Sequence, residues 1–273
     1  MDFINAIILL SNFVIVPSIT YGSQLALGAI GVTLIYGVLR FANFAYGDLM
    51  AFGTMCVILF TWLLKSWGIS LGILPTALLA LPFGIVLTIG VSLFFDRTVF
   101  EYYRNKKSSP VTFIVVSLGI MFVLNAVVRI IIGPNDIVFM DGARFIISAV
   151  EFRETTGLLE GLTIKSTQVI TIITTSITCY LLFNFLNKTK TGKSMRAYSN
   201  NEDLALLSGI DPNRIILITW IIVSILATIG GTLYGLDKSF KPFTYFNNLL
   251  PIFAATIVGG IGNPLGAFYG GFV

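Results

Sequence analysis

The chain contains no histidine and only two cysteines among its 273 residues. Without histidine it lacks the usual proton shuttle, the usual metal ligand and the usual catalytic base. Cys56 and Cys179 both fall within apolar runs, and their spacing fits no metal-ligand pattern. Paired carboxylates within the apolar runs are missing as well, which disfavours a membrane enzyme. The sequence therefore predicts no catalytic residue, no metal site and no cofactor.

Charge is also scarce: 11% of the residues are charged, 56% are hydrophobic, and the mean hydropathy is +0.91. Soluble chains carry about 25% charged residues. The apolar runs are about 20 residues long, which is the length of a helix that crosses a bilayer. We expect an all-α, polytopic helical membrane protein of about seven or eight membrane segments, some short or broken. The composition does not suggest nucleic-acid binding.

The apolar runs place the expected spans. Residues 3–16 form a short run that Pro17 and Gly22 interrupt, and whether this run crosses the membrane stays open. A fuller candidate covers residues 22–39, where small residues at helical spacing favour close helix packing. The other expected spans are 49–64, 71–95, 111–132, 169–186 and 215–233, followed by a glycine-rich apolar region after Leu249.

Lysine and arginine indicate the orientation. The polar connections 96–110 and 187–214 are basic, whereas 133–168 is acidic on balance. Cytoplasmic loops carry an excess of Lys and Arg, so both basic connections are assigned to the cytoplasm. Counting backward places residues 40–48 on the cytoplasmic side too. Arg129 is expected near the outer membrane edge, where a long side chain can reach the headgroups.

The most polar of these connections, residues 187–214, contains the signals of a short helix. Asn200 or Asn201 can cap it, and Glu202 and Asp203 then suit the positive end of the helix dipole. Leu204, Leu207 and Ile210 then supply an apolar stripe. Gly209 is the expected stop of this helix, and Asp211 and Pro212 cap and begin the next one. Such a helix is either an ordinary connector or a docking element.

Within the same connection, residues 191–194 read T-G-K-S. A nucleotide-binding phosphate loop would need a glycine five positions before Gly192, and Asn187 stands there. Nucleotide binding by this chain is therefore disfavoured, and the basic residues are expected at the lipid headgroups of the membrane.

Several stretches resemble the permeases of ABC importers. Residues 203–209 resemble the E-A-A-x-x-x-G signature of that superfamily, with Asp in place of Glu and Leu in place of the first Ala. Residues 35–48 resemble the Y-G-x-x-x-x-x-N-F-A-H-G-x pattern of branched-chain amino-acid permeases, with Tyr46 in place of His. Residues 191–197 and 255–267 resemble two further blocks of that family. The ordered matches extend over nearly the whole chain.

The resemblance implies a single permease domain over residues 1–273, with a cytoplasmic coupling loop at 187–214. It implies a multi-pass protein of the bacterial inner membrane, in contact with membrane lipid. The implied partners are cytoplasmic ATPase subunits on which this loop docks, a second homologous permease, identical or not, that completes the pore, and a periplasmic solute-binding protein. Hydrolysis of ATP is expected on the partners. The residues implied in coupling are Gly192, Arg196, Glu202, Asp203, Leu204, Leu207 and Gly209.

Candidates for the translocation pathway come from the other two blocks: Asn43, Phe44, Asp48, Gly259, Gly260 and Asn263. The Gly-Gly pair and Asn263-Pro264 predict a broken helix, whose free backbone groups can hold a polar solute. Tight packing through glycine is the alternative interpretation, and both can hold together. Asn43 and Asp48 are open to the same choice between structural and pathway roles.

The resemblance implies branched-chain amino acids as substrate, with urea or short amides as the alternative. An autonomous secondary transporter is a further alternative, although the spans offer few ionisable groups for ion coupling. Permeases of this family usually continue through further spans after the glycine block, so the sequence is expected to lack its final spans.

Overall fold

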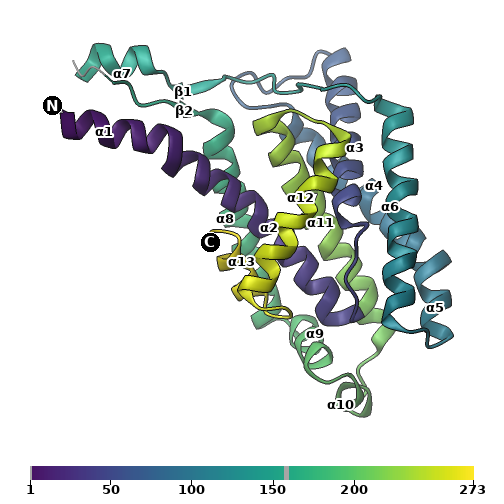
Figure 1. Cartoon of the computed structure of the whole chain (residues 1–273). Coiled ribbons are helices and arrows are strands. Elements are labelled where there is room, and N and C mark those ends of the chain that lie inside the picture. Colours follow the sequence, from purple (N-terminus) through teal and green to yellow (C-terminus); the bar gives the residue numbers. More distant parts are fainter. Residues whose placement is uncertain (1, 157–159) are drawn as a thin grey trace.

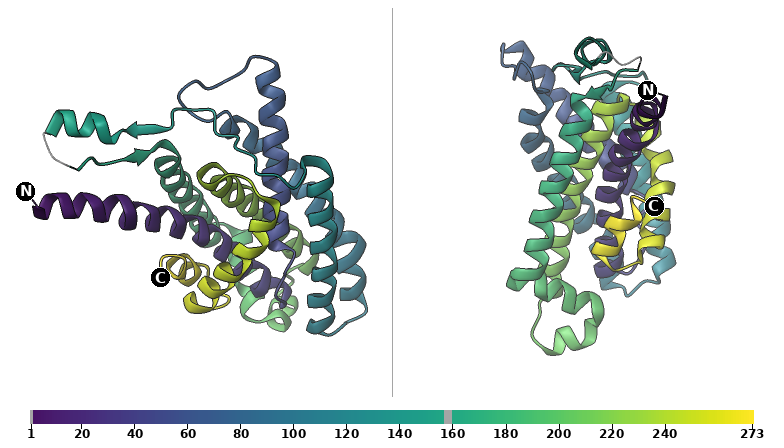
Figure 2. Two further views of the ribbon diagram at one scale, coloured as in Figure 1. Left: turned by 45° about the horizontal axis from the view of Figure 1, so that its top comes forward. Right: turned by 90° about the vertical axis from the view of Figure 1, so that its left-hand side faces the viewer.

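The computed structural model describes residues 2–156 and 160–273 and forms a helical bundle (Figures 1 and 2). Six helical segments in the described residues are long and apolar enough to cross a membrane. Their bounds are Ile4–Leu39, Tyr46–Ser66, Ala77–Asn105, Pro110–Ile132, Ser166–Lys188 and Pro212–Lys238. With the broken pair α12 (Pro242–Gly259) and α13 (Pro264–Gly270), this confirms an all-α polytopic membrane protein.

The first span is longer than the sequence suggests. α1 (Asp2–Leu10), the π-helical turn η1 (Ser11–Ile15) and α2 (Val16–Leu39) follow without a gap. Pro17 comes just after the π-helical turn, and such a local π adjustment lets a membrane helix continue through a proline, which lacks an N–H. The expectation that Pro17 and Gly22 interrupt the helix is therefore wrong.

The centre of the bundle is formed by α2, α3 (Tyr46–Ser66) and α11 (Pro212–Lys238), with α4 (Ala77–Phe95) against α3 and α11. Small residues permit the close approach. A Cβ added to Gly231 of α11 would lie 2.6 Å from Thr54 Oγ1 of α3. Ser92 of α4 and Ser224 of α11 share a buried hydrogen bond of 2.7 Å. The centre is thus held by close packing and interhelical hydrogen bonds.

A non-helical link, residues 40–45, connects α2 to α3 and climbs along the bundle (Figure 1). Arg40 ends α2 in a left-handed conformation, with φ 60°. Phe41 then stacks on Phe113, near the start of α6 (Pro110–Ile132), with ring centroids 5.1 Å apart. Asp48 lies further along, bonded to Asn125 in the second half of α6. Only the Arg40 end of this stretch is therefore exposed, and Asp48 is buried between helices, contrary to its expected place beside the cytoplasm.

The basic connection after α4 is more helical than expected. The π-helical turn η2 (Asp96–Phe100) and α5 (Glu101–Asn105) extend α4 beyond Phe95. Arg104 binds Asp96 through both guanidinium nitrogens, at 2.6 and 3.2 Å. The pair joins the first residue of η2 to a residue of α5, so it ties the two parts of this extension together.

Opposite α9 and α10, the chain forms a small cap over the bundle (Figure 2). It contains the antiparallel pair β1 (Phe145–Ile147) and β2 (Ile164–Lys165), and α7 (Ala149–Thr156) between them. Asn12 of η1 holds this cap with its whole carboxamide: Nδ2 donates to the Gly161 carbonyl at 2.8 Å, and Oδ1 accepts from the Thr163 N–H at 2.9 Å. The first helix and the cap therefore move together.

Asp141 joins the same cap to the ends of α3 and α4. Its Oδ1 accepts the N–H of Thr76 at 2.9 Å, and Lys65 Nζ lies 3.2 Å from its Oδ2. Burial raises the pKa of Asp141, but the Thr76 hydrogen bonds and the Lys65 ammonium outweigh it, so the pKa lies below its ordinary value. Because the folded pKa is depressed, this stabilisation is complete above the unfolded pKa of about 3.9 and is lost as pH falls through the folded value.

We expect Asp141→Asn to lower the free energy of unfolding by about 1 kcal/mol at pH 7, since one charge-assisted hydrogen bond weakens. At pH 3, which lies below the unfolded pKa of about 3.9, the difference should shrink. Thermal unfolding of the purified chain in detergent at both pH values measures it. Asp136→Asn is the control, because Asp136 pairs with Lys241 at an exposed site, where ion pairs contribute little. An equal loss in both variants, or one unchanged at pH 3, would contradict the assignment.

Candidate functional site

The polar connection between α8 (Ser166–Lys188) and α11 projects from one end of the bundle (Figure 1). It contains two helices, α9 (Lys190–Asn200) and α10 (Glu202–Leu207), of which the sequence predicted only the second. α9 begins at Thr189, whose Oγ1 accepts the N–H of Gly192 at 3.0 Å. Its buried residues Met195 and Tyr198 are three positions apart, the spacing of one helical face. That spacing is the signal that could have revealed α9.

α10 has the caps that the sequence predicts. Asn201 Oδ1 accepts the N–H of Leu204 at 3.0 Å, so Asn201, rather than Asn200, is the N-cap. After the helix, Gly209 has φ 77°, its N–H donates to Leu206 and the N–H of Ile210 donates to Ala205. This Schellman motif closes the helix. Asp211 then caps α11, accepting from Asn213 N at 3.0 Å. The short helix is therefore held firmly at both ends.

Two predicted coupling residues form an exposed apolar ridge on α10. Leu204 is 61% exposed and Leu207 is 85% exposed, while Ala205 packs inward. Asp203, also exposed, lies beside them in the first turn. Exposed leucines at the polar end of a molecule provide apolar surface that binding of another protein can bury. The arrangement fits a surface that docks on another protein.

Glu202 connects α10 to α9. Its Oε1 accepts the hydroxyl hydrogen of Tyr198 at 2.6 Å. Burial and then the Glu202 carboxylate raise the pKa of Tyr198, so its hydroxyl stays a donor throughout the physiological range. The two helices thus share a hydrogen bond that does not titrate near neutral pH.

α9 is in turn bound to the bundle at both of its ends. Arg40, at the end of α2, donates from Nη2 to the carbonyl of Ser199 at 2.5 Å. At the other end, Gly192 lies so close to α8 that a Cβ would collide with the carbonyl of Phe185 and approach Leu186 Cα to 2.6 Å. Movement of α10 would therefore reach α8 through Gly192, and reach the link between α2 and α3 through Arg40.

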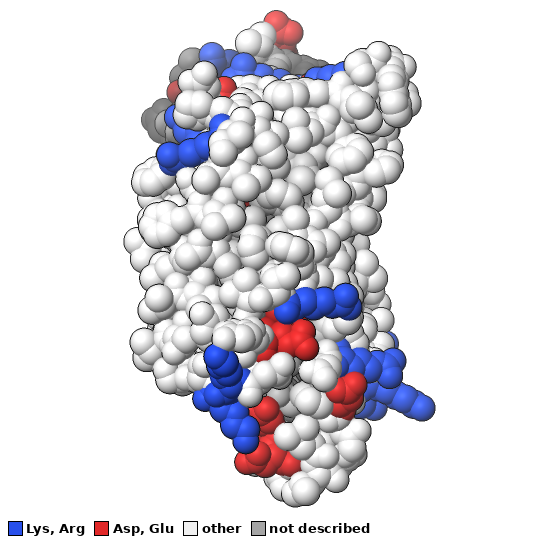
Figure 3. All heavy atoms as spheres, turned by 90° about the vertical axis from the view of Figure 1, so that its right-hand side faces the viewer, with Lys and Arg blue, Asp and Glu red and all other residues white. Residues whose placement is uncertain are grey.

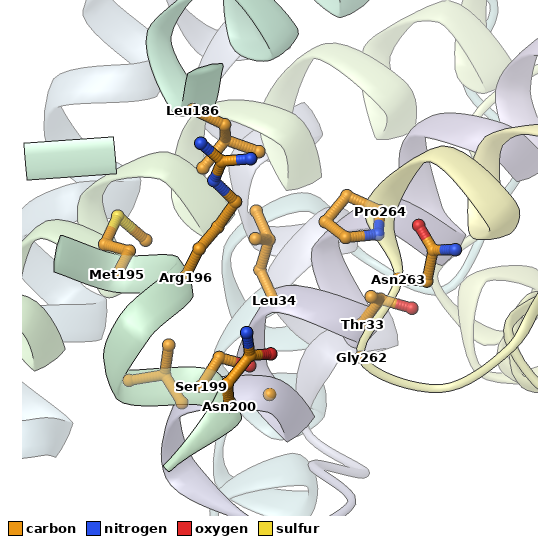
Figure 4. Close-up of a pocket in the computed structure, with 12 residues that line it drawn as sticks. Thr33, Leu34, Leu186, Met195, Arg196, Ser199, Asn200, Gly262, Asn263 and Pro264 are labelled. Atoms are coloured by element: carbon orange, nitrogen blue, oxygen red, sulfur yellow. The ribbon is translucent and has the colours of Figure 1, made fainter. Parts of the chain in front are cut away.

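Arg196, another predicted coupling residue, lines a pocket of about 290 Å³ between α2, α8, α9 and the start of α13 (Figure 4). Leu34 lies at its centre, and Arg196 extends beside it toward Leu186. Asn263 and Pro264 form the opposite wall. The pocket therefore brings a residue predicted for coupling together with one predicted for the pathway.

The break between α12 and α13 has the predicted form. α12 ends at Gly259, Gly260 has φ 94°, and Asn263 caps α13 by accepting the N–H of Gly266 at 3.2 Å. Gly259 also packs directly on the returning helix, where a Cβ would collide with the Gly266 carbonyl. Both interpretations of this glycine block, a broken helix and tight packing, are therefore present in the fold.

The remaining pathway candidates lie elsewhere, inside the bundle. Asn43 Oδ1 accepts the N–H of Ala45 at 3.0 Å, and the N–H of Phe44 donates to Ser117 of α6 at 3.1 Å. Asn43 lines a cavity of only about 10 Å³. Asp48 Oδ1 accepts from Asn125 Nδ2 at 2.7 Å, whereas its Oδ2 has no hydrogen-bond partner in the described residues. These groups are buried and separate from the pocket that Asn263 lines.

Comparison with known proteins places the chain in a family. Residues 14–273 match the family described as "Branched-chain amino acid transport system / permease component". The high-affinity branched-chain amino acid transport system permease protein LivH of Escherichia coli (strain K12) is 26% identical over 260 residues, 93% of this chain and 80% of LivH. BraD of Pseudomonas aeruginosa is 26% identical, covering 95% of this chain and 82% of BraD.

A probable branched-chain amino acid transport permease protein LivH of Methanocaldococcus jannaschii is 29% identical, covering 94% of this chain and 76% of that protein. No solved structure shows a significant match. The family match covers the helical bundle, the connection that contains α9 and α10, and the broken helix alike. The chain belongs to the permease components of branched-chain amino acid transport systems.

Proposed function

We propose that this permease component translocates branched-chain amino acids and is driven by a separate ATPase that docks on α10. The observation that carries the proposal is the exposed Leu204 and Leu207 ridge on a helix fixed by caps at both ends. A rigid, apolar projection can pass a force, whereas a loose loop would absorb it. The names of the relatives, which are branched-chain amino acid permeases, support the substrate class.

The transmitting contacts are those on either side of α9. The hydrogen bond from Tyr198 to Glu202 joins α10 to α9, and the bond from Arg40 to Ser199 joins α9 to the link that precedes α3. Asn43, Phe44 and Asp48 follow Arg40 within that link and the first turn of α3. A displacement of α10 would in this way reach the buried polar groups of the bundle.

A second homologous permease would complete the pore, and a solute-binding protein would deliver substrate at the opposite end, over the cap. Lipid-facing side chains surround the remaining surface; among the exposed ones are Val86, Phe94, Val115, Phe122 and Ile173. This exposed apolar surface supports a place in the membrane for the bundle.

Uptake into proteoliposomes tests the proposal. The chain would be reconstituted with its ATPase, its permease partner and its binding protein, and radiolabelled leucine uptake measured with and without ATP. We expect uptake that needs ATP and that excess isoleucine and valine inhibit by competition. Competition by urea or acetamide but not by isoleucine would favour the short-amide alternative. Uptake without ATP that follows an ion gradient would favour a secondary transporter and overturn the ATPase-driven proposal.

A further inference from the structure

A second pocket, of about 330 Å³, lies where the end of α2, the turn between α5 and α6, α9 and the start of α11 meet. Three cationic side chains line it: Arg40, Arg104 and Lys107. They come from parts of the sequence that only the fold brings together. The pocket lies at the end of the bundle where charged residues gather, over α5 and α10 (Figure 3).

The charges in this pocket do not balance. Arg104 is neutralised by Asp96. The Glu202 carboxylate also lines the pocket and keeps its negative charge, since its partner Tyr198 is a neutral donor, so one anion faces the two remaining cations, Arg40 and Lys107. Arg40 donates to a neutral carbonyl, and in the part of the chain that the structure describes neither Arg40 nor Lys107 forms a salt bridge. Gathered cations repel one another unless an anion joins them. The pocket therefore has a net positive charge and room for an anion.

The backbone also holds two of these residues in an unusual form. Arg40 has φ 60° and Lys107 has φ 49°. Among the described residues only three that are not glycine have a positive φ, the third being Ser239. Such conformations persist where the surrounding structure maintains them, and they cluster at binding sites. Two of these three residues, Arg40 and Lys107, are the cations of this pocket that form no salt bridge in the described residues.

An apolar surface continues from the pocket along α6. Pro110 and Phe113, in the first turn of α6, line the pocket. Val111, Val115 and Phe122 follow along the helix and are all more than half exposed. On the face shown in Figure 3, charged side chains gather at both ends, and the broad band between them is almost free of charge. A headgroup-sized cationic pocket is therefore joined to a surface that suits hydrocarbon.

We propose that this pocket binds the phosphate of an anionic phospholipid, whose acyl chains lie against the exposed side of α6. Arginine and lysine bind phosphate oxygens through charge-assisted hydrogen bonds, and basic pockets between membrane helices suit acidic headgroups. A free phosphate would neutralise the cations but would leave the apolar surface of α6 uncovered. A zwitterionic lipid would add no net negative charge.

The position of the pocket connects lipid binding to the coupling segment. Tyr198 and Glu202, which join α9 to α10, line the same pocket as Arg40. A bound headgroup would hold Arg40 beside the end of α9 and so stiffen the contact with Ser199. This consequence depends on the proposed function, whereas lipid binding itself does not.

Binding would be measured on the purified full chain in neutral detergent, by native mass spectrometry and by thermal unfolding, with phosphatidylglycerol, phosphatidylcholine and inorganic phosphate as separate additions. We expect phosphatidylglycerol to bind at least about tenfold more tightly than phosphatidylcholine and to raise the unfolding temperature. Inorganic phosphate at the same concentration should have little effect. Equal binding of both lipids would overturn the proposal, and so would an equal stabilisation by inorganic phosphate.

Two variants locate the site. Lys107→Gln and Arg40→Gln are each expected to weaken phosphatidylglycerol binding about tenfold, the loss typical of one charge-assisted contact. Lys106→Gln is the matched control, because Lys106 is adjacent in sequence but its Nζ contacts Tyr102 and does not line the pocket. If Arg40→Gln unfolds in detergent alone, exposed Lys107 still provides the test. An equal loss in the Lys106 variant, or none in the Lys107 variant, would contradict the assignment.

Discussion

Replacing Leu207 with aspartate should weaken association of the chain with its ATPase at least about tenfold and reduce ATP-driven uptake to a similar degree, while the fold stays intact. Leu207 is 85% exposed, so a polar side chain there has no packing to disrupt within the chain. At a docked interface the same carboxylate would be buried without a partner. A charge left unpaired in a buried interface costs about 2 kcal/mol or more, and about 1.4 kcal/mol corresponds to a factor of ten in affinity.

Co-purification of the ATPase with tagged permease, followed by titration of the two in detergent, measures the effect. Asn213→Asp is the matched control, because it adds the same charge at an exposed site just after α10 and at the positive end of α11. Leu207→Ala should give an intermediate loss. Normal association of the Leu207→Asp protein, with normal uptake, would show that α10 is a connector and that the ATPase docks elsewhere.

The caps of α10 were predictable because each is a local property of the sequence. Asn201 and Asp211 bind N–H groups two or three residues ahead, and Gly209 adopts its left-handed conformation without a partner elsewhere in the chain. α9 was missed because its mean composition is polar. Only the positions of Met195 and Tyr198, which pack inward, distinguish it from a loop.

The contacts that join α9 and α10 to the rest of the bundle could not be predicted in the same way. Arg40 and Ser199 are 159 residues apart, and nothing in either stretch indicates that they meet. The burial of Asp48 depends on the rise of residues 40–45 along α6, which follows from the packing of Phe41 on Phe113. The numbers of Lys and Arg in each connection predict its side of the membrane, but they do not predict how deeply a residue such as Asp48 is buried between the helices.

The family resemblance supplied candidate residues for the site but not their arrangement in space. It grouped Asn43, Asp48 and Asn263 as one pathway, but the structure separates the first two from the third. It assigned Arg196 to coupling, yet Arg196 and Asn263 line one pocket. The proposed coupling helix pair and the broken helix are thus neighbours, so a movement of α9 would act on the start of α13 as well as on α2.

The contact between α12 and α13 leads to the second large effect, a Gly259→Ala variant that folds poorly and does not transport. A Cβ at Gly259 would collide with the carbonyl of Gly266 and lie 2.6 Å from Ala267 N. The colliding atoms are backbone, so they cannot move aside as a side chain could, and α13 would have to separate from α12. Overpacking of this kind costs about 1–3 kcal/mol.

Because α13 begins at the wall of the pocket shared with Arg196, this separation should affect transport more than ATPase association. Thermal unfolding, uptake and ATPase co-purification of the same preparation distinguish the three effects. Gly119→Ala on α6 is the control: no heavy atom lies within 4 Å of its added Cβ, and alanine in a helix is favoured over glycine by about 0.5–1 kcal/mol. If the Gly259 variant is as stable and as active as the Gly119 variant, α12 and α13 do not depend on this close contact, and the broken helix has no role in uptake that requires it.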